Sequence, residues 1–114
     1  MENDCIFCKI INGQIPADIV YQDDKILAFS DINPIAPVHI LIIPKQHIKN
    51  VEQIDEKNAD LIGYIFEKAG EIAKSKNLCD GYRVVVNTGK DAGQSVFHVH
   101  FHLIGGRQLA WPAG

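Results

Sequence analysis

The sequence predicts an α+β domain, in which an antiparallel sheet of about five strands is covered by one long helix and preceded by a short amino-terminal helix. One observation is that apolar residues recur at helical spacing over a long stretch only once, in residues 60–76. Another is that the β-branched runs are separated by short turns, which join antiparallel strands and are too short for parallel crossovers. A chain of 114 residues has room for a single core, so we expect one domain over residues 1–114.

The amino-terminal half is expected to hold a short helix and three strands. The helix covers residues 5–12 and ends at Gly13, because glycine is favoured just past a helix C-terminus. The strands are β-branched or aromatic runs, at 19–21, 26–29 and 38–43. The first two flank the polar stretch 22–25, which predicts a hairpin. Two prolines in 31–37 prevent regular pairing there, so this segment is a loop.

The carboxy-terminal half is expected to hold the long helix and two further strands. In residues 60–76 the apolar side chains share one helical face, and the charged side chains share the other. The strands are predicted at 82–86 and 97–104. The loop between them contains Gly89 and Gly93, whose conformational freedom allows backbone N–H groups to turn toward an anion. By itself such a loop is more often a simple connection.

Composition excludes two classes of partner. The formal net charge of -3 comes without clustered Lys and Arg, which argues against nonspecific nucleic-acid binding. The longest apolar run, Ile40–Ile43, is far too short to span a bilayer. The amino terminus, Met1–Asp4, is acidic where a signal peptide would be basic. These features predict a cytoplasmic protein that acts on neither nucleic acid nor membranes.

The cysteines indicate a metal site. Three cysteines in a reducing compartment do not predict a disulfide framework. Cys5 and Cys8 have the two-residue gap typical of one half of a zinc site, and the other half has to come from elsewhere in the chain. Cys79 has no cysteine neighbour, and we expect it to be a small buried apolar side chain.

Three histidines, His98, His100 and His102, occupy alternate positions of the last predicted strand. Alternation places them on one face of the sheet, while the apolar residues between them pack into the core. A solvated face is a poor explanation, because such faces usually carry Thr, Lys, Glu and Ser. One zinc ion held by all three is excluded by their span of about 13 Å along a straight strand, since zinc–nitrogen bonds are about 2 Å. A division of labour fits the spacing: one structural ligand, one nucleophile and one stabiliser of charge.

The stretch 98–104, HVHFHLI, resembles the His-φ-His-φ-His-φ-φ signature of the histidine triad (HIT) superfamily, in which φ is apolar. Further blocks that resemble the family occur in its order, at 5–10, 29–34, 36–39, 86–89 and 93–95. The ending 105–112, GGRQLAWP, is similar to the Hint-like branch. The resemblance covers nearly the whole chain and implies the HIT-like fold.

The resemblance implies that His100 attacks the α-phosphorus of a nucleotide and forms a covalent nucleotidyl-histidine. Imidazole suits this role because its reference pKa of about 6.5 leaves it largely neutral at pH 7. A backbone carbonyl that holds the Nδ1 proton would leave Nε2 as the nucleophile. His102 would donate to a nonbridging phosphate oxygen. His39 would orient His100, and the Ser95 hydroxyl would pass a proton to the leaving amine; a core histidine is the alternative for His39.

The nucleotide site that the resemblance implies has three parts. Asn87, Gly93, Gln94 and Ser95 would contact the phosphate, together with His100 and His102. Asp31 would accept the ribose hydroxyls; otherwise it is a turn carboxylate. An apolar slot would hold the base, for which the alternative is plain core packing. Its residues are Ile6, Phe7, Ile10, Phe29 and Ile32.

The resemblance also implies a structural zinc and a homodimer. Cys5, Cys8, His47 and His98 would form a closed tetrahedral site, which leaves no position for substrate and attaches the amino-terminal segment to the sheet. The alternative is a pair of thiols without metal. Trp111, near the end of the chain, would lie near the active site of the partner subunit, unless it packs on its own subunit.

Together these features predict a purine nucleoside phosphoramidate hydrolase. It would cleave the P–N bond of a substrate such as adenosine 5′-phosphoramidate and release the nucleoside monophosphate and an amine. A dinucleoside polyphosphate hydrolase of the Fhit type would use the same histidines but needs room for a second nucleotide, against which the Trp111 ending argues. A nucleotide-binding interaction module would need no turnover, so its cellular role would survive a His100→Ala change.

Overall fold

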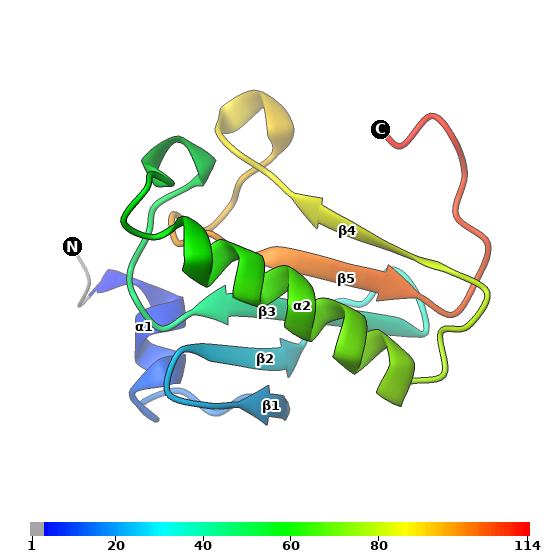
Figure 1. Cartoon of the computed structure of the whole chain (residues 1–114), viewed down its shortest axis with the longest axis horizontal. Helices are drawn as coiled ribbons and strands as arrows, with labels where there is room; N and C mark the ends of the chain where they lie inside the picture. Colours follow the sequence, from blue (N-terminus) through cyan, green and yellow to red (C-terminus); the bar gives the residue numbers. More distant parts are fainter. Residues whose placement is uncertain (1–3) are drawn as a thin grey trace.

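The structure is a computed structural model that describes residues 4–114, and it confirms the predicted α+β class (Figure 1). The helices are α1 (Ile6–Ile11) and α2 (Ala59–Ser75), with short 3-10 turns η2 (Val51–Gln53) and η3 (Lys90–Ala92). The strands are β1 (Ile19–Gln22), β2 (Ile26–Ser30), β3 (Val38–Pro44), β4 (Tyr82–Val86) and β5 (Phe101–Gly105). No helix among residues 4–114 has both the length and the apolar character needed to cross a membrane.

The five strands form one antiparallel sheet in the order β1-β2-β3-β5-β4. The last strand of the chain therefore lies between β3 and β4, as Figure 1 shows. In the β3–β5 register, Leu41 is opposite His102 and His39 is opposite Ile104. This pairing brings a histidine of β3 and a histidine of β5, which are far apart in sequence, onto neighbouring strands.

The two faces of the sheet pack against different helices. Helix α2 crosses one face (Figure 1) and buries Ile65, Ala69 and Ile72 against alternate residues of the sheet. On β5 and just before it, those residues are the predicted apolar set, Val99, Phe101 and Leu103, each at most 1% exposed. A smaller cluster lies on the opposite face, where Phe7 and Cys8 of α1 pack against the sheet. The histidine side chains of β3 and β5 share this second face, as alternation requires.

The β1–β2 turn is closed by Asp23. Its Oδ1 accepts the backbone N–H groups of Lys25 and Ile26 at 2.8 and 2.9 Å, an arrangement that Asp favours in turns. Its Oδ2 accepts the hydroxyls of Tyr21 and of Tyr64 on α2, which ties the helix to the hairpin. Burial alone would raise the pKa of Asp23, but these hydrogen bonds outweigh it and lower the pKa well below the ordinary value.

Two sequence predictions are wrong in detail. The predicted strand 97–104 begins only at Phe101. The ladder cannot continue backward, because Pro44, at the end of β3, has no N–H to donate. Instead the Pro44 carbonyl accepts from the His98 ring at 2.8 Å, and the Val99 N–H donates to the Ile48 carbonyl at 2.6 Å. Cys79, expected to be buried, is exposed in the turn after α2, where the preceding Leu78 takes the buried place.

Candidate functional site

His100 is held in one tautomer by the backbone. Its Nδ1 lies 2.8 Å from the carbonyl oxygen of His98, and because a carbonyl only accepts, Nδ1 carries the proton. Nε2 therefore keeps its lone pair. The side chain is 5% exposed, and burial lowers its pKa, although the His98 carbonyl and Asp31 oppose this shift. The geometry gives His100 the neutral form that a nucleophile needs.

A chain of hydrogen bonds sets the tautomers of His39 and His102. The Ile35 N–H donates to Nδ1 of His39 at 3.2 Å, so the proton of neutral His39 is on Nε2. That Nε2 lies 2.9 Å from Nδ1 of His102, to which it donates. The remaining proton of His102 is then on Nε2. Within residues 4–114, this atom is buried and has no hydrogen-bond partner. Leaving a buried donor without a partner costs about 1–3 kcal/mol, so it marks a place for an acceptor from a ligand.

His102 is neutral at physiological pH. Burial, followed by the neighbouring His100 and His39, lowers its pKa to about 4, and Asp31 opposes the shift. Its Nε2–H is thus a donor because of the tautomer and not because of charge. Next to it, the His100 ring offers a lone pair at a ring-centroid distance of 5.0 Å. The two rings present opposite hydrogen-bonding character, one accepting and one donating.

His39 contacts a different histidine from the one expected. The sequence predicts that it orients His100, whereas the hydrogen bond in the structure goes to His102. The reason is the register: His39 is opposite Ile104, so His102 is its diagonal neighbour on the same face of the sheet.

Asp31 lies close to His39 and His102. Its Oδ2 is 3.4 Å from Nε2 of His39, while Oδ1 accepts the Asn33 N–H at 2.8 Å, as in the turn alternative. Asp31, His39 and His102 also have the spacing of a metal-ligand set. The Ile35 N–H bond argues against that use, because it leaves Nε2 of His39 protonated and without a lone pair for a metal. The Nε2–H of His39 instead faces Nδ1 of His102 at 2.9 Å and Oδ2 of Asp31 at 3.4 Å.

Gln94 shapes the loop before the histidines. Its buried side-chain amide donates to the carbonyls of Lys49 and Val96 at 2.8 and 3.1 Å and accepts the Gly89 N–H at 2.9 Å. Both amide hydrogens are therefore used within the protein, and the backbone N–H of Gln94 donates to the Gly89 carbonyl at 3.0 Å, so the donors of Gln94 hold the loop together and do not face a phosphate. Gly93 is exposed and has a φ of 82°, a conformation that favours glycine.

Some of the predicted site residues line two hollows. One, of about 490 Å³, is lined by His39, Asn87 and His102, and its outer wall is the carboxy-terminal segment Leu109–Ala113 without Trp111. The other, of about 510 Å³, is lined by Ile6, Ser95, the predicted metal ligands Cys5 and His47, and residues that the sequence did not single out. Those residues include Lys49, whose ammonium lies 5.6 Å from the centroid of the exposed Phe97 ring. No local motif marks this pair.

The predicted base slot is partly core and partly surface. Phe7 and Phe29 are buried, and their rings meet edge to face with centroids 5.6 Å apart. This arrangement agrees with the alternative of core packing. Ile10 is half-buried beside them. Ile6 and Ile32 are 46% and 93% exposed, so these two apolar side chains are available to a ligand.

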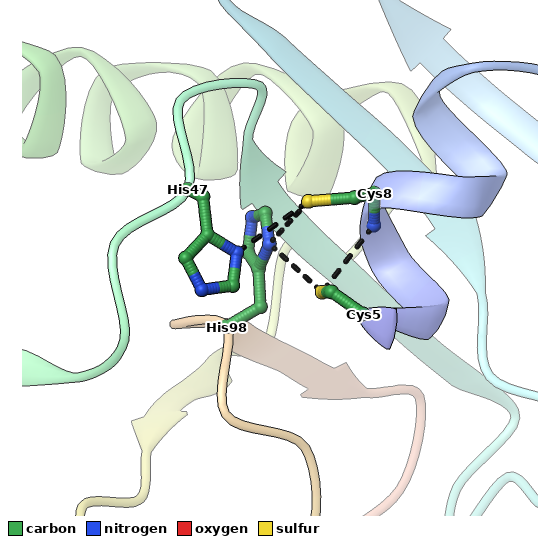
Figure 2. Close-up of side chains that lie close together, drawn as sticks. All are labelled: Cys5, Cys8, His47 and His98. Carbon is green, nitrogen blue, oxygen red and sulfur yellow. Dashed lines mark hydrogen bonds between the residues drawn. The ribbon is translucent and has the colours of Figure 1, made fainter. Parts of the chain in front are cut away.

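Four predicted metal ligands from three separate segments meet on the α1 side of the sheet, as Figure 2 shows. Cys5 is the N-cap of α1, Cys8 lies in its first turn, His47 follows β3 and His98 precedes β5. Sulfur-to-nitrogen distances are 3.4 Å for Cys5–His98, 3.4 Å for Cys8–His47 and 3.6 Å for Cys8–His98.

These distances fit a tetrahedral ion. Zinc bonds of about 2.3 Å to sulfur and about 2.0 Å to nitrogen place neighbouring ligand atoms roughly 3.5 Å apart. His98 donates its Nε2–H to the Pro44 carbonyl at 2.8 Å, so its Nδ1 lone pair faces the thiols. Such an outer hydrogen bond is usual for a histidine ligand. The donor set of two thiols and two imidazoles therefore suits zinc.

The family model for the HIT domain matches residues 12–109. The chain belongs to the HIT family. This confirms the resemblance that the three alternating histidines carried, and the fold that it implied.

Individual HIT relatives are similar over nearly the full length. An uncharacterised HIT-like protein of Synechococcus elongatus is 53% identical, with all of both chains covered. A 14 kDa zinc-binding protein of Zea mays is 50% identical over 96% of this chain and 87% of its own, and it is consistent with the Hint-like branch. The crystal structure of a HIT family hydrolase from Legionella pneumophila has a TM-score of 0.95 at 47% identity, covering 96% of this chain and 99% of that one.

Proposed function

We propose that this HIT protein hydrolyses the P–N bond of purine nucleoside phosphoramidates through a covalent intermediate on His100. The observation that carries the proposal is the pair of opposed tautomers: Nε2 of His100 has a lone pair, and Nε2–H of the adjacent His102 is a buried donor with no partner among residues 4–114. An attack on phosphorus needs both, a nucleophile and a donor to the oxygen on which charge builds.

The reaction would run in two displacements. In the first, Nε2 of His100 forms a bond to the α-phosphorus while the P–N bond to the amine breaks. The amine leaves after receiving a proton, for which we assign the exposed Ser95 hydroxyl as the donor, itself reprotonated from water. In the second, water attacks phosphorus, the bond to His100 breaks, and the nucleoside monophosphate departs. His102 donates to a nonbridging oxygen throughout.

Four of the substrate contacts predicted from the family suit the structure. Asn87, beside His102 in the hollow of about 490 Å³, is suited to the phosphate. The exposed Ile6 and Ile32 are suited to one face of the base, and Asp31 to the ribose hydroxyls. The name of the Legionella relative supports hydrolysis, but the choice of phosphoramidate comes from the Hint-like ending of the chain.

A zinc ion on Cys5, Cys8, His47 and His98 is proposed to be structural. When bound, it would supply a fixed link between the amino-terminal segment and the sheet. The name of the maize relative and the fit of the four donors support zinc. With four protein ligands, no coordination position is left for substrate. We also propose a homodimer in the cytoplasm; the 83% exposure of Trp111 supports a partner surface at this residue.

Intact-mass spectrometry after rapid mixing with adenosine 5′-phosphoramidate tests the proposal. We expect a nucleotidyl adduct on the wild-type chain and none on His100→Ala. Hydrolysis at the wild-type rate in both proteins would refute His100 as nucleophile. A parallel reaction with a dinucleoside polyphosphate identifies the Fhit-type alternative, and nucleotide binding without turnover of either substrate would favour an interaction module.

A further inference from the structure

His98 takes part in two sites at once. Its side chain is fully buried and belongs to the metal cluster, with Nδ1 toward the sulfurs of Cys5 and Cys8 (Figure 2). Its backbone carbonyl accepts the Nδ1–H of His100 at 2.8 Å. One residue therefore links the metal ligands to the tautomer of the nucleophile. A rotation of the His98 backbone would move the acceptor that keeps Nε2 of His100 unprotonated.

Phe7 makes a second link. It lies between Cys5 and Cys8 in sequence, so the positions of these two ligands fix it. The centroid of its ring lies 5.9 Å from that of the His98 ring and 5.1 Å from that of the His100 ring, and both contacts are edge to face. Helix α1, which carries Phe7, has six residues, and a helix this short is not stable by itself in water. Its place on the sheet depends on its packing and on the cluster at its start.

We propose that the metal cluster positions the nucleophile. A zinc ion on Cys5, Cys8, His47 and His98 holds the His98 backbone so that its carbonyl keeps the Nδ1 proton of His100, and it holds Phe7 against the His100 ring. His98 and Phe7 are thus positioning residues, in addition to any role in stability. The inference rests on the proposed role of His100 as nucleophile.

Without the ion, the four ligand side chains lose the shared partner that fixes their distances of 3.4–3.6 Å. The Pro44 bond of His98 remains, but it holds only the ring. The peptide that carries the His98 carbonyl is held by the Val99 N–H bond to the carbonyl of Ile48, the residue next to the ligand His47. We therefore expect the metal-free protein to keep its sheet and its α2 core, which do not include the cluster, while His100 samples other orientations and tautomers.

The test compares zinc-loaded and chelator-stripped protein by NMR of the histidine ring nitrogens and protons. Loss of zinc is expected to raise solvent exchange of the His100 Nδ1–H by about tenfold, the factor expected when a protecting hydrogen bond of ordinary strength is lost. Single-turnover formation of the adduct should fall by a similar factor, and added zinc should restore both. His47→Ala should act like chelation, since it removes a ligand whose ring meets that of His98 but which belongs neither to the helix of Phe7 nor to the strand of His102. Cys79→Ser, which alters a cysteine outside the cluster, is the matched control.

Unchanged exchange of the His100 proton in a folded, metal-free protein would overturn the proposal. If metal-free protein unfolds, the comparison moves to zinc-loaded and cadmium-loaded protein, because the larger ion shifts the ligands without unfolding the chain. The ring signals of His98 and His100 should then move together, and a shift of His98 alone would overturn the coupling. The proposed function fails separately, if zinc-loaded wild-type protein forms no adduct while the ring signals still respond to metal.

Discussion

The hydrogen bond from His39 to His102 predicts that His39 acts on catalysis without touching substrate. Substituting His39→Phe keeps a ring of similar size on β3 and removes the Nε2–H that selects the His102 tautomer. A hydrogen bond of this kind is worth about 1 kcal/mol, which changes the ratio of the two tautomers about fivefold. We expect the rate of adduct formation to fall by a factor of about 5–10, which is far less than the loss of about 100-fold expected when His102, as a donor to the oxyanion, is removed.

The assay is single-turnover adduct formation at saturating adenosine 5′-phosphoramidate, combined with ring-nitrogen NMR of His102. His39→Gln is the informative control, since its side-chain amide can still donate to Nδ1 of His102 and should recover part of the rate. A His102 that stays protonated on Nε2 in His39→Phe, with an unchanged rate, would show that the hydrogen-bond chain through Ile35 and His39 does not set the tautomer.

Three further predictions follow from the same structure. The pKa of His102 falls from an ordinary value near 6.5 to about 4 on folding, so the unfolded chain binds more protons between these values. The unfolding free energy should therefore decrease as pH falls from about 6.5 to about 4. Urea titrations at each pH should show a smaller decrease in His102→Gln. Gln94→Ala removes the side-chain hydrogen bonds to Gly89, Lys49 and Val96, so it should destabilise the protein by about 1–3 kcal/mol. It should also weaken AMP binding, as measured by calorimetry. An unchanged affinity would mean that Gln94 does not shape the loop. Light scattering should give a mass of twice the 12.7 kDa chain, with Trp111→Ala lowering adduct formation; a monomer at micromolar concentration would exclude the proposed dimer.

Local sequence patterns were sufficient to predict the sheet, the long helix and the alternation that separates histidines from core residues. Their failures come from contacts over long sequence distances. His39 and His102 are 63 residues apart, and only the β3–β5 register determines that they meet. The late start of β5 depends on Pro44, which the β3–β5 register would place opposite Val99 in the first part of the predicted strand. No pattern within residues 97–104 reveals where Pro44 lies. Cys79 was expected to be buried from its residue type alone, whereas the turn after α2 exposes it.

The candidate site was predicted through the family and not through propensity. The ligand set Cys5, Cys8, His47 and His98 meets in space as expected. His47 follows β3, His98 precedes the neighbouring strand β5, and α1 packs against this face of the sheet. The bonds of Gln94 could not be foreseen, since an amide in a glycine-bearing loop can face either the ligand or the protein. To predict that Nε2–H of His102 lacks a partner among residues 4–114, the positions of Ile35 and His39 have to be known, and these follow only from the folded chain.

The two uses of His98 impose different demands on evolution. Its imidazole faces the thiols of Cys5 and Cys8, with which it would share an ion, and donates to the Pro44 carbonyl. Its carbonyl, by contrast, belongs to the main chain, so every amino acid at this position supplies the acceptor for His100. A descendant that lost both cysteines could therefore replace this histidine with an apolar residue, provided that packing held the main chain in the same path. Of the three alternating histidines, the first is the one whose side chain has no part in the proposed attack on phosphorus.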